Sequence, residues 1–355
     1  MIRPASKDGS ITPRNLSVDR SIITESDAQS KVPDWRLICG GHLADLITYT
    51  NTSSVFFVVY LILTSTPSIF MGLAIAFCTT TLVVHAFTAF STLICVPAMI
   101  FDHFFATDIC SYLSHLGYWV LRIHGKVIHG HEILGKENIP KTSGGLIVYH
   151  HLLFPYDLVY LMSDFYFEHG KQLSGIIHSK MVKICPGLCR MLPFFSGKES
   201  LIRKLRRGEI CSVAPGGGYE AVFGDNTTLL WRGRTGFAAA AKECGVPIIP
   251  MYTVNGNEAT PLRLCAFREF FAEVHEATRR VPYLPMLHFP VKLRTILGEP
   301  LLCGENESPE DFAERVKLAI DDLRDRYRRR PGSTWLAFLE RFGYIPSPSK
   351  EGCRP

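Results

Sequence analysis

Hydrophobic positions along this chain follow two patterns, which meet near residue 102. Between Leu46 and Phe101 the sequence contains no Asp, Glu, Lys or Arg. A membrane-spanning helix needs about 20 predominantly apolar residues, so this stretch is long enough for two spans or for a re-entrant hairpin. The pattern therefore predicts a membrane anchor over residues 46–101.

Two arrangements of the anchor fit the sequence. In one, spans at about 55–77 and 82–101 are joined at 79–81, and Pro67 lies inside the first span. In the other, the chain turns at 65–68, but its first span then contains a polar run. We favour the first arrangement, because membrane helices tolerate proline better than soluble helices do.

The residues before the anchor form a polar tail. Residues 1–45 carry scattered charges with Ser and Pro and lack the apolar core of a signal peptide, so we expect this tail to be disordered. Two spans or a hairpin leave both flanks on one side of the membrane. The positive-inside rule places that side in the cytosol. The positive residues of the tail include Arg3, Arg14, Arg20, Lys31 and Arg36.

After the anchor, short apolar runs alternate with amphipathic stretches. The runs predict strands at 145–149, 173–177, 210–214, 246–252 and 291–297. Helices are predicted at 113–123, 198–207 and 234–244. This alternation predicts an α/β domain over 102–345, with a mixed sheet covered by helices, followed by a short tail at 346–355.

The clearest helix signal begins at Ser308. Ser308 suits the N-cap, Pro309 suits the first helical position, and Asp311 falls three residues after the cap. Apolar residues then recur at helical spacing up to Tyr327.

Charge and composition exclude some classes of partner. The net charge is +5, and no basic block is interleaved with aromatic residues, so we do not expect nucleic acid binding. The 11 cysteines are scattered and lack the spacing of a zinc site, which favours reduced thiols and predicts no metal.

A first candidate for chemistry follows directly on the predicted strand 145–149. Residues 148–157 have the sequence VYHHLLFPYD. If Pro155 begins a helix, Asp157 lies in its first turn and can reach the ring of His151 on the preceding loop. An Asp bound to one imidazole nitrogen leaves the other nitrogen free to accept a hydroxyl proton. Spacing alone favours a structural histidine followed by an ordinary N-terminal acid, and His150 is a rival base.

A second candidate follows the predicted strand 210–214. Its glycines let the backbone approach a ligand and turn N–H groups toward phosphate oxygens or an oxyanion. The run lacks the Lys-Ser/Thr of a nucleotide-binding P-loop, so a plain glycine-rich turn stays open as well. Its residues are Pro215, Gly216, Gly217, Gly218, Tyr219 and Glu220.

Together these motifs resemble the glycerolipid acyltransferase family. That family carries a His-x4-Asp motif after a strand, then a Pro-Glu-Gly-Thr-Arg-like loop, then a Val-Pro-Ile-x-Pro strand. Within it, transmembrane protein 68 and its diacylglycerol acyltransferase-like relatives share the His-x5-Asp spacing of His151 and Asp157 and the Val-Pro-Ile-Ile-Pro-Met run at 246–251. The resemblance covers roughly 113–342.

The resemblance implies a glycerol-3-phosphate acyltransferase-like fold and a membrane-bound enzyme. It implies that His151 is the general base, that Asp157 orients it, and that the glycine loop and Arg234 contact substrate. Acyl-CoA is then the co-substrate, with no bound cofactor, and a glycerolipid from the bilayer is the acceptor. Membrane lipids are the remaining partners, and the expected location is the endoplasmic reticulum membrane, with the catalytic domain facing the cytosol.

One departure from the family bears on the acceptor. The loop position that carries Arg in the family, where it is implicated in binding the acceptor phosphate, is Tyr219 here. A neutral acceptor such as mono- or diacylglycerol is therefore favoured, which predicts triacylglycerol synthesis. A lysophospholipid acyltransferase and a catalytically silent membrane adaptor stay open. A serine hydrolase is disfavoured because no Gly-x-Ser-x-Gly motif is present.

Overall fold

The computed structural model describes residues 98, 100–101, 109–141, 143–179, 189, 191–224, 228–260 and 289–343. The predicted anchor over 46–101 lies almost wholly outside them, as do both predicted tails. None of the helices within these ranges is long and apolar enough to cross a bilayer. The predicted spans therefore stay a prediction.

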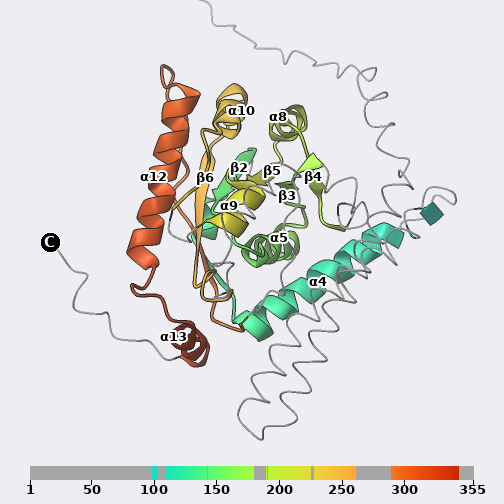
Figure 1. Cartoon of the computed structure of the whole chain (residues 1–355). Helices are drawn as coiled ribbons and strands as arrows, with labels where there is room; N and C mark the ends of the chain where they lie inside the picture. Colours follow the sequence, from blue (N-terminus) through green and yellow to red (C-terminus); the bar gives the residue numbers. More distant parts are fainter. Residues whose placement is uncertain are drawn as a thin grey trace, which may run out of the picture.

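A seven-stranded mixed sheet forms the centre of the described part of the chain (Figure 1). Its strand order is β1-β7-β6-β2-β5-β3-β4. Neighbouring strands are parallel except β6 and β7, which are antiparallel. The strands are β1 (Glu132–Leu134), β2 (Gly145–Tyr149), β3 (Ser174–Ile176), β4 (Phe194–Phe195), β5 (Ile210–Val213), β6 (Ile248–Val254) and β7 (Arg294–Leu297).

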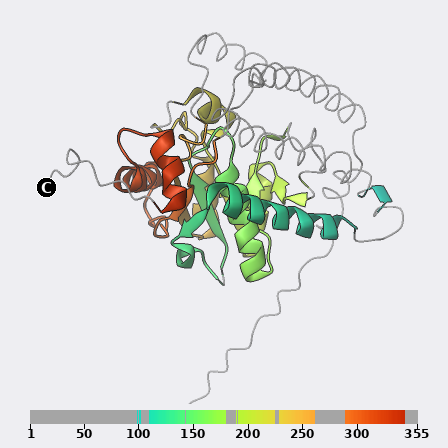
Figure 2. The ribbon, with the colours of Figure 1, turned by 90° about the horizontal axis from the view of Figure 1, so that it is seen from below.

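Helices cover both faces of this sheet, as the α/β prediction requires. The group formed by α8, α10 and α12 packs on one face, and α4, α5 and α13 pack on the other (Figures 1 and 2). The helices are α4 (Ile109–His129), α5 (Tyr156–His169), α8 (Lys198–Arg206), α9 (Gly217–Phe223), α10 (Gly236–Cys244), α12 (Pro309–Tyr327) and α13 (Thr334–Leu339), with 3₁₀ turns η3 (Lys136–Asn138) and η4 (Glu340–Phe342).

The central strand β2 shows how the sequence builds this arrangement. All five of its residues are buried, and its side chains alternate between the two faces of the sheet. Ile147 and Tyr149 join the core beneath α4 and α5, whereas Leu146 and Val148 join the core beneath α8, α10 and α12. A strand buried on both faces reads as a continuous apolar run, which is why its bounds were predicted correctly.

The strong helix signal near the C-terminus is confirmed. The Ser308 hydroxyl accepts a hydrogen bond from the Asp311 amide at 3.0 Å, and Pro309 is the first residue of α12. The buried side of the helix packs on β6. The five predicted strands overlap β2, β3, β5, β6 and β7, and the bounds of β2 agree; β6 begins and ends two residues later than predicted, and β7 begins three residues later. The two-residue and three-residue strands β4 and β1 were not predicted, because runs this short carry no periodicity.

The helix predicted at 113–123 forms, but as part of the longer α4. Its apolar pattern places Leu113, Leu116, Val120 and Ile123 on one face, which predicts that this face is buried. Leu116 and Ile123 are instead exposed. The buried face combines Tyr118 and Leu121 with two glycines, and a Cβ at Gly117 or Gly125 would lie within 2.8 Å of Met191 or 3.0 Å of Tyr160. Close approach of the backbones decides which face packs here.

Candidate active site

His151 lies on the loop between β2 and α5, at the carboxyl end of β2. Its backbone N–H donates to Glu220 Oε1 at 2.8 Å, and its ring Nδ1 lies 2.6 Å from the Leu152 carbonyl oxygen. A carbonyl only accepts hydrogen bonds, so Nδ1 carries the proton and Nε2 is left as the acceptor nitrogen. Burial lowers the pKa of the ring below its ordinary value, which keeps the imidazole neutral near pH 7.

Asp157 occupies the first turn of α5, as predicted, and its side chain is buried. Its Oδ2 accepts from the Thr253 hydroxyl at 2.9 Å, and its Oδ1 accepts from the Leu158 amide at 2.9 Å. Burial raises the pKa of this carboxyl to about 6, although these two hydrogen bonds oppose the rise.

The expected hydrogen bond between Asp157 and the ring of His151 is absent from the described residues. The ring binds the Leu152 carbonyl instead, and the carboxylate binds Thr253. The backbone carbonyl therefore fixes the tautomer, which is the task we had assigned to Asp157. The expectation fails because a neighbouring carbonyl lies closer along the chain than a carboxylate six residues away.

A buried chain of hydroxyl groups continues from Asp157 through the sheet. Thr253 Oγ1 lies 3.1 Å from Thr295 Oγ1, which lies 2.9 Å from His131 Nε2. Because Thr253 donates its only proton to Asp157, the hydrogen bonds run in one direction, from His131 through Thr295 and Thr253 to the carboxylate. Burial lowers the pKa of His131 to about 3, so this ring is neutral. The sequence motifs did not identify Thr253, Thr295 or His131.

The glycine loop opens α9 at the carboxyl end of β5, beside β2. Gly217 has a φ of +58°, a left-handed conformation that L side chains rarely adopt. A Cβ at Gly216 would lie 2.4 Å from the Glu220 carboxyl carbon. Arg234 Nη1 donates to the Pro215 carbonyl at 2.7 Å and to the Gly216 carbonyl at 3.1 Å. The Arg234 side chain thus holds the loop in place by binding two backbone carbonyls of the loop.

Glu220 connects the loop that contains His151 to the segment that follows α9. Its Oε1 accepts from the His151 amide, and its Oε2 accepts from the Leu230 amide at 2.6 Å. Burial raises the pKa of Glu220 to about 7, although these hydrogen bonds lower it. We had predicted a contact between Glu220 and substrate. The geometry shows that Glu220 positions the loop of the candidate base.

Comparisons with known proteins agree with this geometry. Residues 131–254 match the family model described as Acyltransferase. A human protein named "DGAT1/2-independent enzyme synthesizing storage lipids" is 36% identical over 225 residues, which cover 62% of this chain and 68% of that protein. This chain belongs to the acyltransferase family. The family predicted from the motifs is thereby confirmed.

This chain also shows weaker similarities to two other proteins. An uncharacterized protein of Mycobacterium tuberculosis is 26% identical over 206 residues, which are 54% of this chain and 57% of that protein. The crystal structure of the 1-acyl-sn-glycerophosphate (LPA) acyltransferase PlsC from Thermotoga maritima shares 17% identity, with a TM-score of 0.41, over 69% of this chain and 97% of that one. A similarity this low says nothing about the activity of this acyltransferase.

In this acyltransferase, the neighbouring residues His150 and His151 differ in their exposure to solvent. His150 is buried with 6% of its surface exposed, whereas His151 is only half-buried. An incoming hydroxyl can therefore approach His151 more easily. The described part of the chain contains no group of three metal-ligating side chains, so the residues on view offer no metal site.

The loop position of Tyr219 is closer to positive charge than the sequence suggested. The guanidinium of Arg232 lies over the Tyr219 ring, 4.5 Å from its centroid. Arg232 adopts a φ of +54°, which is uncommon for a residue with a side chain. We had expected no cation at this spot. The expectation was wrong because the fold brings Arg232, 13 positions after Tyr219, back to the glycine loop. Spacing along the sequence does not reveal this contact.

Proposed function

We propose that this acyltransferase moves a fatty acyl group from acyl-CoA to the hydroxyl of a glycerolipid, with mono- or diacylglycerol as the acceptor. One observation carries the proposal. Nδ1 of His151 is bound to the Leu152 carbonyl, which leaves Nε2 as a neutral acceptor at the end of β2. A neutral imidazole with one fixed nitrogen suits a general base.

In the proposed reaction, Nε2 of His151 takes the proton of the acceptor hydroxyl as its oxygen attacks the thioester carbonyl. The tetrahedral intermediate then collapses, and the carbon–sulfur bond breaks. The departing thiolate takes the proton from the imidazolium, so the ring returns to its neutral state. No protein nucleophile is needed, because a thioester is already an activated acyl donor.

Asp157 supports the imidazolium through its charge. Its carboxylate is buried and bound to Thr253. A negative charge in a low-dielectric site stabilises a nearby positive charge more strongly than it does in water. The hydrogen bonds from Thr253 and Leu158 favour the ionised carboxylate and hold it in a single position.

The amides of the glycine loop are proposed to stabilise the oxyanion. The Gly217 N–H already donates to the Ala214 carbonyl at 3.0 Å. The role we had assigned to all three glycines therefore falls to the amides of Gly216 and Gly218. Arg234 and Glu220 support this task by fixing both ends of the loop.

Two observations bear on the acceptor. The human relative carries a name that refers to the synthesis of storage lipids, which supports a neutral acceptor for this chain. Arg232 over Tyr219 favours a second candidate function, acylation of a lysophospholipid, because it places a cation beside the glycine loop. We keep the neutral acceptor first, since the ring of Tyr219 already engages the guanidinium of Arg232.

Attachment to the endoplasmic reticulum membrane, with the catalytic domain facing the cytosol, is part of the proposal. The predicted anchor supports it, and so does an exposed apolar stripe along α4. Five large hydrophobic side chains of this helix recur at helical spacing on its outer side, which is typical of a surface that contacts lipid. They are Tyr112, Leu116, Trp119, Ile123 and Val127.

The decisive test incubates membranes that contain the full-length chain with labelled acyl-CoA and a panel of acceptors, beside a His151→Ala control. We expect labelled triacylglycerol from diacylglycerol with the wild type and none with the variant. Equal transfer by both samples would refute the mechanism. Much faster acylation of lysophosphatidic acid than of diacylglycerol would replace the proposed acceptor with the second candidate.

A further inference from the structure

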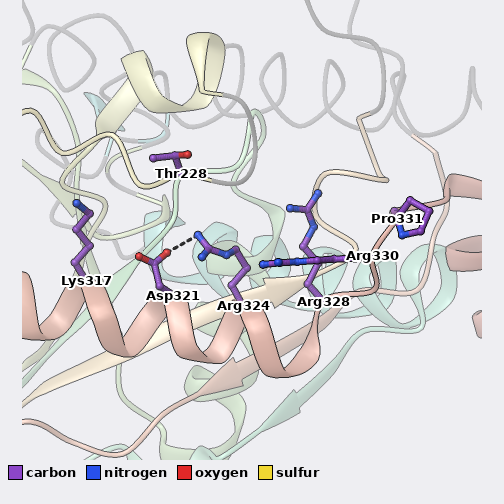
Figure 3. A pocket seen from close by; sticks show the side chains of 8 residues that line it. Thr228, Lys317, Asp321, Arg324, Arg328, Arg330 and Pro331 are labelled. Carbon is purple, nitrogen blue, oxygen red and sulfur yellow. Dashed lines mark hydrogen bonds and ion pairs between the residues drawn. The ribbon is translucent and has the colours of Figure 1, made fainter. Parts of the chain in front are cut away.

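A cationic pocket lies between α12 and Thr228, in the segment that follows α9. Its volume is about 580 Å³, within the usual range of small-molecule sites. Figure 3 shows Lys317, Asp321 and Arg324 projecting from one side of α12 toward Thr228. The lining residues are Thr228, Lys317, Asp321, Arg324, Arg328, Arg330, Pro331 and Gly332. Four of these side chains are cationic and one is acidic.

The acids near the pocket engage three of its four cations. Arg324 pairs with Asp321 and also binds Asp325 at 2.9 Å. Arg330 pairs with Asp325, and Lys317 lies 3.8 Å from Glu314. These carboxylates hold the basic side chains in place without removing the positive excess of the pocket.

Arg328 differs from the other cations of the pocket. Among the described residues it has no carboxylate partner, and its Nε is buried without a hydrogen-bond acceptor. A guanidinium held in this way is costly to bury unless a negative ligand completes its hydrogen bonds. Its planar donors match the oxygens of a phosphate group, which they can bind in pairs.

The pocket lies at the same edge of the sheet as the candidate base. Arg328 acts electrostatically on Tyr252 of β6, and β6 runs parallel to β2, with Met251 beside Tyr149. A second connection runs through the loop, because Thr228 lies two residues before Leu230, whose amide binds Glu220. A ligand in the pocket is therefore placed to extend toward His151.

We propose that this pocket binds a phosphate group of a substrate, either a nucleotide phosphate of the coenzyme A donor or the phosphate of a lipid. The choice of substrate rests on the proposed function, whereas the phosphate chemistry rests on the pocket alone. The basic run 326–330 then contributes Arg328 and Arg330 to a binding site. Within this run, Arg328 is the residue proposed to bind the phosphate.

Binding to the full-length chain in phosphatidylcholine vesicles tests the pocket without requiring turnover. The probes are adenosine 3′,5′-bisphosphate, which carries phosphates but no thioester, and lysophosphatidic acid. We expect Arg328→Ala to weaken binding of one probe by about 10- to 100-fold, the value of a charge-assisted hydrogen bond. Arg328→Gln, which keeps most of the stem, should show the same loss.

The matched control is Arg326→Ala on the same helix. Arg326 is 67% exposed, pairs with Asp322 and does not line the pocket, so its removal should leave both affinities unchanged. A loss confined to the bisphosphate identifies the donor as the source of the phosphate, and a loss confined to lysophosphatidic acid identifies a lipid. If Arg328→Ala binds both probes as the wild type does, or if the wild type binds neither, the proposal is wrong.

Acyl transfer measured on the same samples separates this proposal from the proposed function. If the wild type transfers acyl groups and Arg328→Ala changes neither transfer nor binding, the proposed pocket is wrong and the proposed function stands. If the chain shows no transfer activity but binds the bisphosphate in a way that depends on Arg328, the pocket is supported and the proposed function is wrong. His151→Ala should abolish transfer and leave bisphosphate binding unchanged.

Discussion

Two helices that begin at one edge of the sheet, α5 and α9, each carry a buried carboxyl group, and the two groups are held in different ways. After β2, Asp157 is bound by the hydroxyl of Thr253 and by its own helix. After β5, Glu220 is bound by two backbone amides, and one of them belongs to His151. Burial raises the pKa of both groups, to about 6 and about 7.

The difference assigns separate tasks to two residues of similar chemistry. Glu220 fixes where the backbone of His151 lies, so its removal should disturb both the fold of the loop and the rate. Asp157 makes no hydrogen bond to His151 among the described residues, so the contribution proposed for it is electrostatic. The motif that resembles a catalytic pair thus contains a candidate base whose backbone is bound by Glu220, whereas the assistance proposed for Asp157 acts through its charge.

The largest expected effect distinguishes the two neighbouring histidines of the β2 loop. His151→Ala should lower acyl transfer by about 10²- to 10⁴-fold, because it removes the general base. His150→Ala should retain measurable transfer. The measurement is the initial rate of transfer from labelled acyl-CoA, normalised to the amount of folded protein. The reverse order of the two variants would assign the base to His150.

A second experiment compares the two carboxyl groups directly. Asp157→Asn should lower the rate by about 10- to 100-fold, because it removes the charge. It should lower the thermal unfolding midpoint less than Glu220→Gln does, because the Thr253 hydroxyl can turn to accept from the new amide, whereas a backbone N–H cannot. Glu220→Gln should lower the rate by about tenfold and also destabilise the fold by about 1–2 kcal/mol. Its amide can accept only one of the two backbone N–H groups. Equal unfolding midpoints for both variants would contradict the division of tasks.

The pH dependence of acyl transfer under acidic conditions tests the role of the hydroxyl chain that begins at Thr253. Transfer needs ionised Asp157 and neutral His151, so it should fall as the pH drops through about 6. Thr253→Val removes a hydrogen bond that lowers the Asp157 pKa. The acidic limb should therefore move to higher pH by about one unit, the effect of one charge-assisted bond. Thr253→Ser, which keeps the hydroxyl, serves as the control.

The smallest effect concerns the backbone of the β5 loop. Gly217→Ala places a Cβ on a residue with a φ of +58°, which should cost about 1–2 kcal/mol of folding free energy. Denaturant unfolding measures this loss. Gly233 also has a positive φ and lies in open space, so Gly233→Ala separates the backbone cost from an effect on the loop. If only Gly217→Ala also slows transfer, the loop conformation itself matters for the reaction.

Local sequence patterns predicted much of the fold, because the relevant signals lie within single elements. The continuous apolar run of β2 and the cap at Ser308 each depend on residues close in the sequence. The packed face of α4 was not predictable, since it depends on contacts of Gly117 and Gly125 with Met191 and Tyr160. A helix with apolar side chains on two sides does not reveal which side meets the core.

The site was predictable to a similar extent. His151 and Asp157 stand in a short motif, and their elements are those expected. Their hydrogen bonds were not predictable, because each partner arrives from another strand or loop. Thr253 and Thr295 are adjacent only because β6 and β7 pair antiparallel, with these two residues in register. Pairing between strands 42 residues apart leaves no trace in a local pattern.

The place of β1 in the sheet has a consequence for the order of folding. β1 is the first strand of the described chain, and β7 is both its last strand and the only neighbour of β1. During synthesis, the segment with β2, β5 and β6 emerges and can pair while β1 still has no partner. Because His131 meets Thr295 across this final junction, a chain cut before Arg294 would lose both the edge of the sheet and the end of the hydroxyl chain. The ribosome must therefore release nearly the whole domain before the candidate site can be completed.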